Sequence, residues 1–257
     1  MGLVLEHKDA IVEFNFALTK LQNEVYNNGE PKTDDDWKNI IFCSLYEGYT
    51  SSFCMIDKEE INFQIENEEA ITKRIRNWLR EDKFLQTYLT GEFKIDADVK
   101  NDSDLYEGYY DLIIQHSNWK KKKLIFECKC LNNNSISIKE YIHNPNKKRA
   151  KHTDFQDGGV FRFVINKYSE NLDFGGMIGY IQSGNCQKII QDIKETLKTT
   201  KINFKGIKVG ELINEGIENN INNNPYTFNS KHKCYDESKS EFINPILIHH
   251  IFFDFVN

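Results

Sequence analysis

The chain has 257 residues and a formal net charge of −6 at pH 7, which is enough length to bury a core in one domain or in one and a half. The acidic balance argues against a protein that coats nucleic acid through overall basic charge, although a local basic cluster could still bind phosphate. The sequence shows no apolar run long enough to span a membrane and no basic region followed by an apolar core at the N-terminus. The six cysteines have no Cys-x-x-Cys spacing, so we expect free thiols, a cytoplasmic location and no membrane partner.

The first 65 residues predict a helical region. Apolar residues recur at helical spacing over residues 11–25, at Ile11, Phe14, Leu18, Leu21 and Val25. A second helix is expected to begin at the cap Thr33, because acidic residues at 34–36 suit the positive end of the helix dipole. We assign residues 1–65 to a helical part that could pack on the core, form dimer contacts or contact substrate.

Residues 66–257 predict a second domain in which strands and helices alternate. Its first helix is expected over 66–89, where Ile71, Ile75 and Leu79 form an apolar stripe. The later segments, in chain order, are strands over 92–99, 109–115 and 123–131, a helix over 157–168 capped by Asp157, a strand over 175–182, a helix over 186–199, and strands over 227–235 and 244–255. This order predicts an α/β fold with a β-sheet flanked by helices.

Several conspicuous residues have structural rather than catalytic interpretations. The glycines of GGMIG at 175–179 indicate close strand packing. His249 and His250 lie in an apolar strand, where alternation predicts that only one of them faces inward as a core histidine. The Asn-rich stretches LNNNS and ENNINNN are typical of exposed loops.

Three charged residues stand in the two apolar runs that flank residues 116–122. Asp111 interrupts YYDLII, and Glu127 and Lys129 interrupt LIFECKCL. Strands of Leu, Ile and Phe are normally buried, and an unpaired buried charge is very costly. We therefore interpret these three residues as a functional site and, most economically, as one built around a divalent cation.

The two runs can form an antiparallel hairpin. Because side chains alternate along a strand, Glu127 and Lys129 share one face and Cys128 points to the other. A turn centred on Trp119 places Asp111 opposite Glu127, where two carboxylates about 5 Å apart would repel by about 3 kcal/mol. A cation between them converts this repulsion into attraction, and carboxylate oxygens suit Mg²⁺, with Lys129 beside the phosphate or the attacking water.

At these residues the chain resembles the PD-(D/E)XK, or restriction-endonuclease-like, nuclease superfamily. Asp111 matches the strand Asp of the motif, and Glu127-Cys128-Lys129 matches its Glu/Asp-x-Lys. The superfamily often has Pro before its Asp, where this chain has Tyr110. Residues 160–181 and the C-terminal strands are also similar to bacterial proteins of this fold that have no assigned role and are thought of as defence-associated.

The resemblance implies roles for several residues. Asp111 and Glu127, with the carbonyl of Cys128, would bind Mg²⁺ or Mn²⁺, and Lys129 would be catalytic. The superfamily often adds an acidic residue on the preceding helix, for which Glu68 is favoured over Glu69 by its register. Nucleic-acid contacts are expected from two basic sets after the motif, namely Lys147, Lys148, Arg149 and Lys151, and then Arg162 and Lys167.

Other interpretations compete with this one. Glu-x-Lys also occurs at Glu92-Phe-Lys94, which alternates like a strand but follows a helical segment that offers no partner strand. Glu127 and Lys129 could form a surface ion pair of little energetic value, and the Glu68 carboxylate could simply favour the helix dipole. A zinc site at Cys128, Cys130 and a histidine would lie on the face opposite Glu127, which we expect to pack under a helix.

The sequence thus predicts a restriction-endonuclease-like mixed sheet and an Mg²⁺-dependent endonuclease. Its expected substrate is nucleic acid, DNA before RNA, in bacterial or phage defence, and hydrolysis of a duplex would suit a homodimer. The alternative function is a catalytically weak or inactive nuclease-like subunit that binds nucleic acid or serves in assembly.

Overall fold

The computed structural model divides the chain into two units. Unit 1 comprises Met1–Ala97, Leu112–Leu124 and Asn257, and unit 2 comprises Asp98–Asp111 and Ile125–Val256. The structure describes residues 33–56, 62–81, 93–96, 111–119, 122–149, 152–166, 172–199, 203–204, 207–208, 215–218, 226–236 and 239–256. The expected helix over residues 11–25 lies outside these ranges, and the expected domain boundary at residue 65 stays a prediction.

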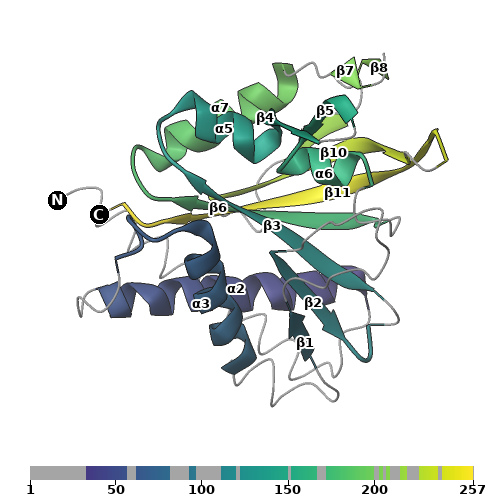
Figure 1. Cartoon of the computed structure of the whole chain (residues 1–257). Coiled ribbons are helices and arrows are strands. Elements are labelled where there is room, and N and C mark those ends of the chain that lie inside the picture. Colours follow the sequence, from purple (N-terminus) through teal and green to yellow (C-terminus); the bar gives the residue numbers. More distant parts are fainter. Residues whose placement is uncertain are drawn as a thin grey trace. The chain divides into compact units, whose positions relative to one another are not determined.

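Unit 1 contains two described helices, α2 (Asp34–Ile56) and α3 (Glu68–Glu81), which contact each other (Figure 1). The cap predicted at Thr33 is present. The Thr33 hydroxyl accepts a hydrogen bond from the Asp36 N–H at 3.1 Å, and the Asp36 carboxylate accepts one from the Thr33 N–H at 2.8 Å. This reciprocal pair satisfies two backbone N–H groups at the N-terminus of the helix.

Helix α3 buries the apolar stripe that its sequence predicts, with Ile71, Ile75 and Leu79 inward. Unit 1 also contains the antiparallel pair β1 (Phe93–Asp96) and β2 (Leu112–His116). Phe93 and Lys94 of the rival Glu-x-Lys therefore lie in a strand that has a partner, which comes after it in the chain. Lys94 lies opposite Gln115, and the described residues of β2 carry no carboxylate.

Unit 2 is built on a five-stranded mixed sheet. Its strands, in spatial order, are β3 (Lys123–Leu131, of which Ile125 onward belongs to this unit), β6 (Phe174–Ile181), β11 (Glu241–Asp254), β10 (Thr227–Asp236) and β9 (Glu215–Glu218). The first two pairings are parallel and the last two are antiparallel. The α/β class and the helix-flanked sheet are thereby confirmed.

Three helices lie on the same side of this sheet (Figure 1): α5 (Ser135–Ile142), α6 (Val160–Val164) and α7 (Cys186–Thr199). The Tyr141 hydroxyl of α5 lies 3.0 Å from the His250 ring nitrogen Nδ1 of β11, and Lys194 of α7 lies over the Phe228 ring of β10. None of the described helices is both long and apolar enough to cross a membrane.

Strand β6 is buried along its whole length, and its glycines permit the close approach that the sequence predicts. A Cβ atom on Gly175 would lie 2.5 Å from the Phe163 ring of α6, and one on Gly176 would lie 2.1 Å from the Phe126 ring of β3. These positions leave room only for hydrogen, so the neighbouring aromatic rings pack directly against the backbone.

The region after β3 differs most from the expected elements. Helix α5 was not predicted, and residues 144–157 form a small antiparallel sheet of β4 (Asn144–Arg149) and β5 (His152–Asp157). Asp157 ends β5 and does not cap a helix, so the helix expected over 157–168 is short and begins after Gly159. A second small sheet pairs β7 (Asn203–Phe204) with β8 (Ile207–Lys208).

The expectation that only one of the two adjacent histidines faces inward was wrong. His249 is 5% exposed and His250 is completely buried. Strand β11 is central in the sheet of unit 2, between β6 and β10, and its residues 248–253 are all buried. A strand buried on both faces does not show the alternation on which the expectation rested.

Candidate active site on strand β3

Strand β3 holds the Glu-x-Lys residues in a largely buried run of Leu, Ile, Phe and Cys. As predicted, Glu127 and Lys129 share one face and Cys128 points to the other, where its thiol accepts a hydrogen bond from the Tyr180 hydroxyl at 3.3 Å. The Glu127 side chain is fully buried, and the Lys129 side chain is 19% exposed. A charged pair this deep in a strand needs compensating partners.

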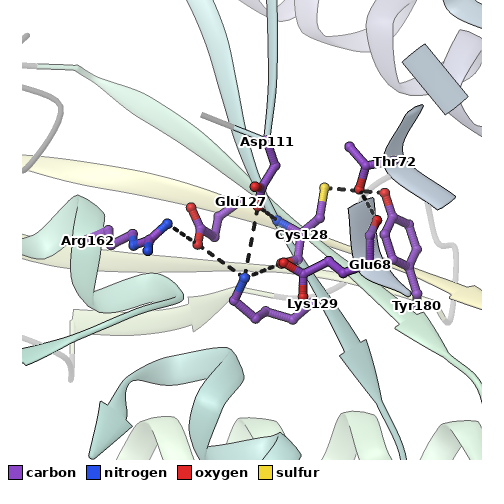
Figure 2. A network of polar contacts seen from close by, with 8 residues as sticks. All are labelled: Glu68, Thr72, Asp111, Glu127, Cys128, Lys129, Arg162 and Tyr180. Carbon is purple, nitrogen blue, oxygen red and sulfur yellow. Dashed lines mark hydrogen bonds and ion pairs between the residues drawn. The ribbon is translucent and has the colours of Figure 1, made fainter. Parts of the chain in front are cut away.

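Asp111 reaches the same place from just before β2. The Cys128 N–H donates a hydrogen bond to Asp111 Oδ2 at 2.6 Å, which fixes the carboxylate beside the backbone of β3 (Figure 2). A turn forms at Trp119 as expected, through hydrogen bonds of its N–H to the His116 carbonyl and of its carbonyl to the Lys122 N–H. The structure thus brings Asp111 to the residue next to Glu127.

The Lys129 ammonium lies among three oxygen atoms. Its Nζ is 2.5 Å from the Cys128 carbonyl oxygen, 3.2 Å from Glu127 Oε1 and 4.0 Å from Asp111 Oδ2. Figure 2 shows this nitrogen below the two carboxylates, with the side chain folded back toward its own strand. These are the same three oxygens that the sequence analysis assigns to a metal ion, and here they surround a cationic group of the protein.

A second cation, Arg162 of α6, also binds Glu127. Its Nη1 donates to Glu127 Oε1 at 2.5 Å, and its side chain is 15% exposed (Figure 2). The sequence predicts a nucleic-acid contact for Arg162, and its pairing with the Glu127 carboxylate was not predicted. The basic character of the residue was visible in the sequence, but the end and phase of the short helix were not.

The position of α6 explains how Arg162 reaches the strand. The helix begins after Gly159, whose φ of +50° is a left-handed conformation, and the chain leaves it at Asn166, with φ of +48°. A Cβ atom on Gly159 would lie 1.8 Å from the Tyr141 carbonyl oxygen, so glycine is needed there for space as well as conformation. Phe163, the neighbour of Arg162, packs on Gly175 of β6.

Electrostatic balance within this cluster comes from the protein itself. Asp111 and Glu127 contribute two negative charges, and Lys129 and Arg162 contribute two positive charges at 2.5–4.0 Å from their oxygens. The repulsion between the carboxylates is therefore offset without a metal ion, in contrast to the reasoning from sequence. A buried carboxylate such as Glu127 is stable when it is paired and hydrogen-bonded in this way.

The residues nevertheless fit a hard divalent cation. Two carboxylates and one backbone carbonyl point at a common position, and Mg²⁺ takes one or two carboxylates and completes its shell with water and phosphate. Within the described parts of the chain, no group of three or more His, Cys, Asp and Glu side chains could hold a metal. A zinc site that uses Cys128 and Cys130 therefore gains no support from them.

The other predicted site residues are Glu68 and the basic residues that follow the motif. Glu68 is the first residue of α3 in unit 1, where its carbonyl accepts a hydrogen bond from the Thr72 hydroxyl at 2.7 Å. The basic residues Lys147, Lys148 and Arg149 lie on β4. Lys151 and Lys167 lie outside the described residues. The roles of Glu68 and of these lysines stay predictions.

Comparisons of the chain with protein-family models, with curated proteins and with solved structures found no match.

Proposed function

We propose that the protein is a metal-dependent nuclease, which hydrolyses phosphodiester bonds in nucleic acid at the β3 cluster of unit 2. One observation carries the proposal, namely the convergence of Asp111, Glu127 and the Cys128 carbonyl on a single cation position, which the Lys129 ammonium occupies. The resemblance of these residues to the PD-(D/E)XK superfamily supports the same assignment.

In this proposal Asp111, Glu127 and the Cys128 carbonyl hold Mg²⁺ or Mn²⁺. When bound, such an ion supplies positive charge to the scissile phosphate and makes a neighbouring water more acidic. Lys129 moves out of the oxygen cluster and places its ammonium beside the phosphate or the attacking water. There it stabilises the negative charge that develops in the transition state. Buried Glu127 stays fixed by its strand and so defines the position of the reacting groups.

DNA is the proposed substrate, on the grounds of the family resemblance. RNA is the alternative substrate, and a comparison of DNA and RNA cleavage distinguishes the two. A role in bacterial or phage defence follows from the same resemblance, and action as a homodimer would suit hydrolysis of a duplex. The basic residues Lys147, Lys148 and Arg149 on β4 would contribute backbone contacts, which need local positive charge and not a basic protein overall.

A second candidate function is a nuclease-like subunit that binds nucleic acid or assembles with other proteins without cleaving. The observation that favours it is the internal charge balance of the cluster. Because Lys129 and Arg162 already compensate both carboxylates, the cluster does not need a metal ion for its charge balance. A cluster that served only to stabilise the fold would show the same charge balance.

The two functions are separated by a nicking assay on supercoiled plasmid with Mg²⁺ and then Mn²⁺, with single-stranded and duplex RNA run in parallel. The proposal expects metal-dependent cleavage by the wild type, abolished by EDTA, with DNA cut faster than RNA. Nucleic acid that is bound but left intact with both metals would establish the binding function instead. Faster cleavage of RNA would retain the chemistry and change the substrate.

A further inference from the structure

The Glu127 carboxylate has one oxygen that two cations share. Glu127 Oε1 accepts from Arg162 Nη1 at 2.5 Å and lies 3.2 Å from Lys129 Nζ. This oxygen is also one of the three that the proposed function assigns to the metal. The contacts of the metal-free protein therefore occupy a ligand that the active form requires.

A divalent cation bound to Glu127 Oε1 would repel the Arg162 guanidinium, because Arg162 Nη1 lies 2.5 Å from the same oxygen. The Glu127 side chain is fully buried, so water screens this repulsion less than it would at the surface. Glu127 lies in the middle of β3 with its side chain fully buried, whereas Arg162 projects from a helix of five residues and is partly exposed. Arg162 is accordingly the group that must move.

We propose that Arg162 is a positioning residue that couples metal binding to nucleic-acid binding. In the metal-free protein it holds Glu127, and when the metal enters it transfers to a phosphate of the bound strand. This inference rests on the proposed function. Arg suits both partners, because its planar guanidinium donates in parallel to the two oxygens of a carboxylate or of a phosphate.

The exchange makes the two ligands cooperative. Without nucleic acid, metal binding must break the Arg162–Glu127 pair, and no phosphate replaces the lost carboxylate partner. With nucleic acid, the guanidinium gains a phosphate partner, so the metal binds more tightly. By linkage, the metal must raise the affinity for nucleic acid by the same factor.

The test is a Mn²⁺ titration, followed by electron paramagnetic resonance of the free ion, with and without a DNA duplex whose phosphorothioate linkages resist hydrolysis. For the wild type we expect the duplex to raise Mn²⁺ affinity about fivefold or more, within the ordinary range of coupling between sites. Arg162→Gln should bind Mn²⁺ alone about fivefold more tightly than the wild type, and the effect of the duplex should fall below about twofold.

The gain in Mn²⁺ affinity expected for Arg162→Gln distinguishes exchange from a structural role, since a damaged site would bind Mn²⁺ more weakly than the wild type. Arg74→Gln is the matched control. It removes an Arg that donates two hydrogen bonds to a carboxylate, Glu66, at 2.8 and 3.0 Å in unit 1, and it should titrate like the wild type. Arg162→Lys retains the charge and should stay close to the wild type in Mn²⁺ affinity without duplex.

Unchanged or weakened Mn²⁺ binding by folded Arg162→Gln, together with metal-dependent cleavage by the wild type, would overturn the exchange and leave the nuclease intact. A wild type that binds no Mn²⁺ with or without duplex would overturn both. If Arg162→Gln does not fold, the wild-type titration decides alone, because a duplex that leaves the Mn²⁺ affinity of a cleaving enzyme unchanged contradicts the exchange.

Discussion

At the scale of single residues, the candidate site is a buried carboxylate held by two cations. The alternation of β3 predicts which side chains share a face, and the structure agrees for Glu127, Lys129 and Cys128. The pairing of Arg162 with Glu127 could not be predicted, because Arg162 follows 35 residues later on an element whose start the sequence misplaces. Charge compensation by distant segments is therefore the part of a site that a local pattern leaves out.

The metal assignment predicts the behaviour of Asp111→Asn. The asparagine carbonyl can still accept the Cys128 N–H hydrogen bond that Asp111 accepts, so the variant should fold. It loses one negative ligand, and with it most of the thermal stabilisation by Mg²⁺, which for the wild type should reach about 2.7 kcal/mol at a hundred times the dissociation constant. Differential scanning fluorimetry across a Mg²⁺ series measures the shift.

Asp173→Asn is the control for that series, because Asp173 is an exposed aspartate that also comes just before a strand, β6. It should keep the full Mg²⁺ shift. A shift of wild-type size in Asp111→Asn would show that the metal binds elsewhere on the protein, and the assignment of the β3 cluster would have to be withdrawn.

At the scale of elements, strong periodic patterns were sufficient to predict helices and strands with their bounds, and weak patterns were not. The bounds of α7 and β3 match their predicted ranges, because α7 has a regular apolar stripe and β3 is mainly apolar despite Glu127 and Lys129. Helix α5 was missed because its N-cap, Asn134, belongs to an Asn-rich stretch that we interpreted as a loop. The Asn134 side chain in fact accepts the Ile136 N–H. Asp157 was a misleading cap signal, since it is the last residue of β5 and the cap of α6 is Gly159.

Gly159→Ala tests how α6 is positioned. The added Cβ would meet the Tyr141 carbonyl oxygen at 1.8 Å and would impose a left-handed conformation on a residue that disfavours it. We expect a loss of about 2–4 kcal/mol in the free energy of unfolding by urea, because a backbone atom cannot yield as a flexible side chain can.

Gly184→Ala serves for comparison, since Gly184 also has positive φ, of +101°, but its Cβ would meet the Asn133 side chain. Its loss should be smaller. Equal stability of wild type and Gly159→Ala in urea would mean that the turn before α6 does not have the conformation described above.

At the scale of the whole molecule, a second cluster of polar side chains is buried against the sheet of unit 2. The Ser230 hydroxyl lies 2.6 Å from His232 Nε2 and 2.7 Å from His250 Nε2, and the other ring nitrogen of His250 contacts Tyr141. The His250 ring stacks on Phe228 with centroids 4.1 Å apart. Burial holds the pKa of His250 well below its ordinary value, with smaller contributions from the nearby positive charges of its neighbours.

This burial predicts acid sensitivity of the fold. In the folded protein His250 stays neutral, whereas in the unfolded chain it takes up a proton below about pH 6.5. The unfolded state therefore binds more protons, and stability falls as the pH drops below that value, by at most about 1.4 kcal/mol per pH unit for this group. Urea unfolding at about pH 7.5 and pH 5 measures the difference.

The variant for this test is His250→Phe, which keeps a ring against Phe228 but cannot titrate. It should be less stable than the wild type at neutral pH, because the Tyr141 hydroxyl loses its contact with the ring nitrogen. Its stability should nevertheless fall less on acidification. Part of the slope should remain in both proteins, since burial also lowers the pKa of His143. An identical slope in the two proteins would contradict this account of His250.

The central claim is that the β3 cluster cleaves nucleic acid with Lys129 as a catalytic residue. Its most direct test is the single-turnover rate of DNA cleavage in Mg²⁺ by wild type and Lys129→Ala, with DNA affinity measured on the same samples. We expect cleavage by the wild type, and in the variant a cleavage rate lower by at least about a hundredfold with nearly unchanged DNA affinity. If wild type and variant are equally inert while both bind DNA, or cleave at the same rate, the claim is contradicted.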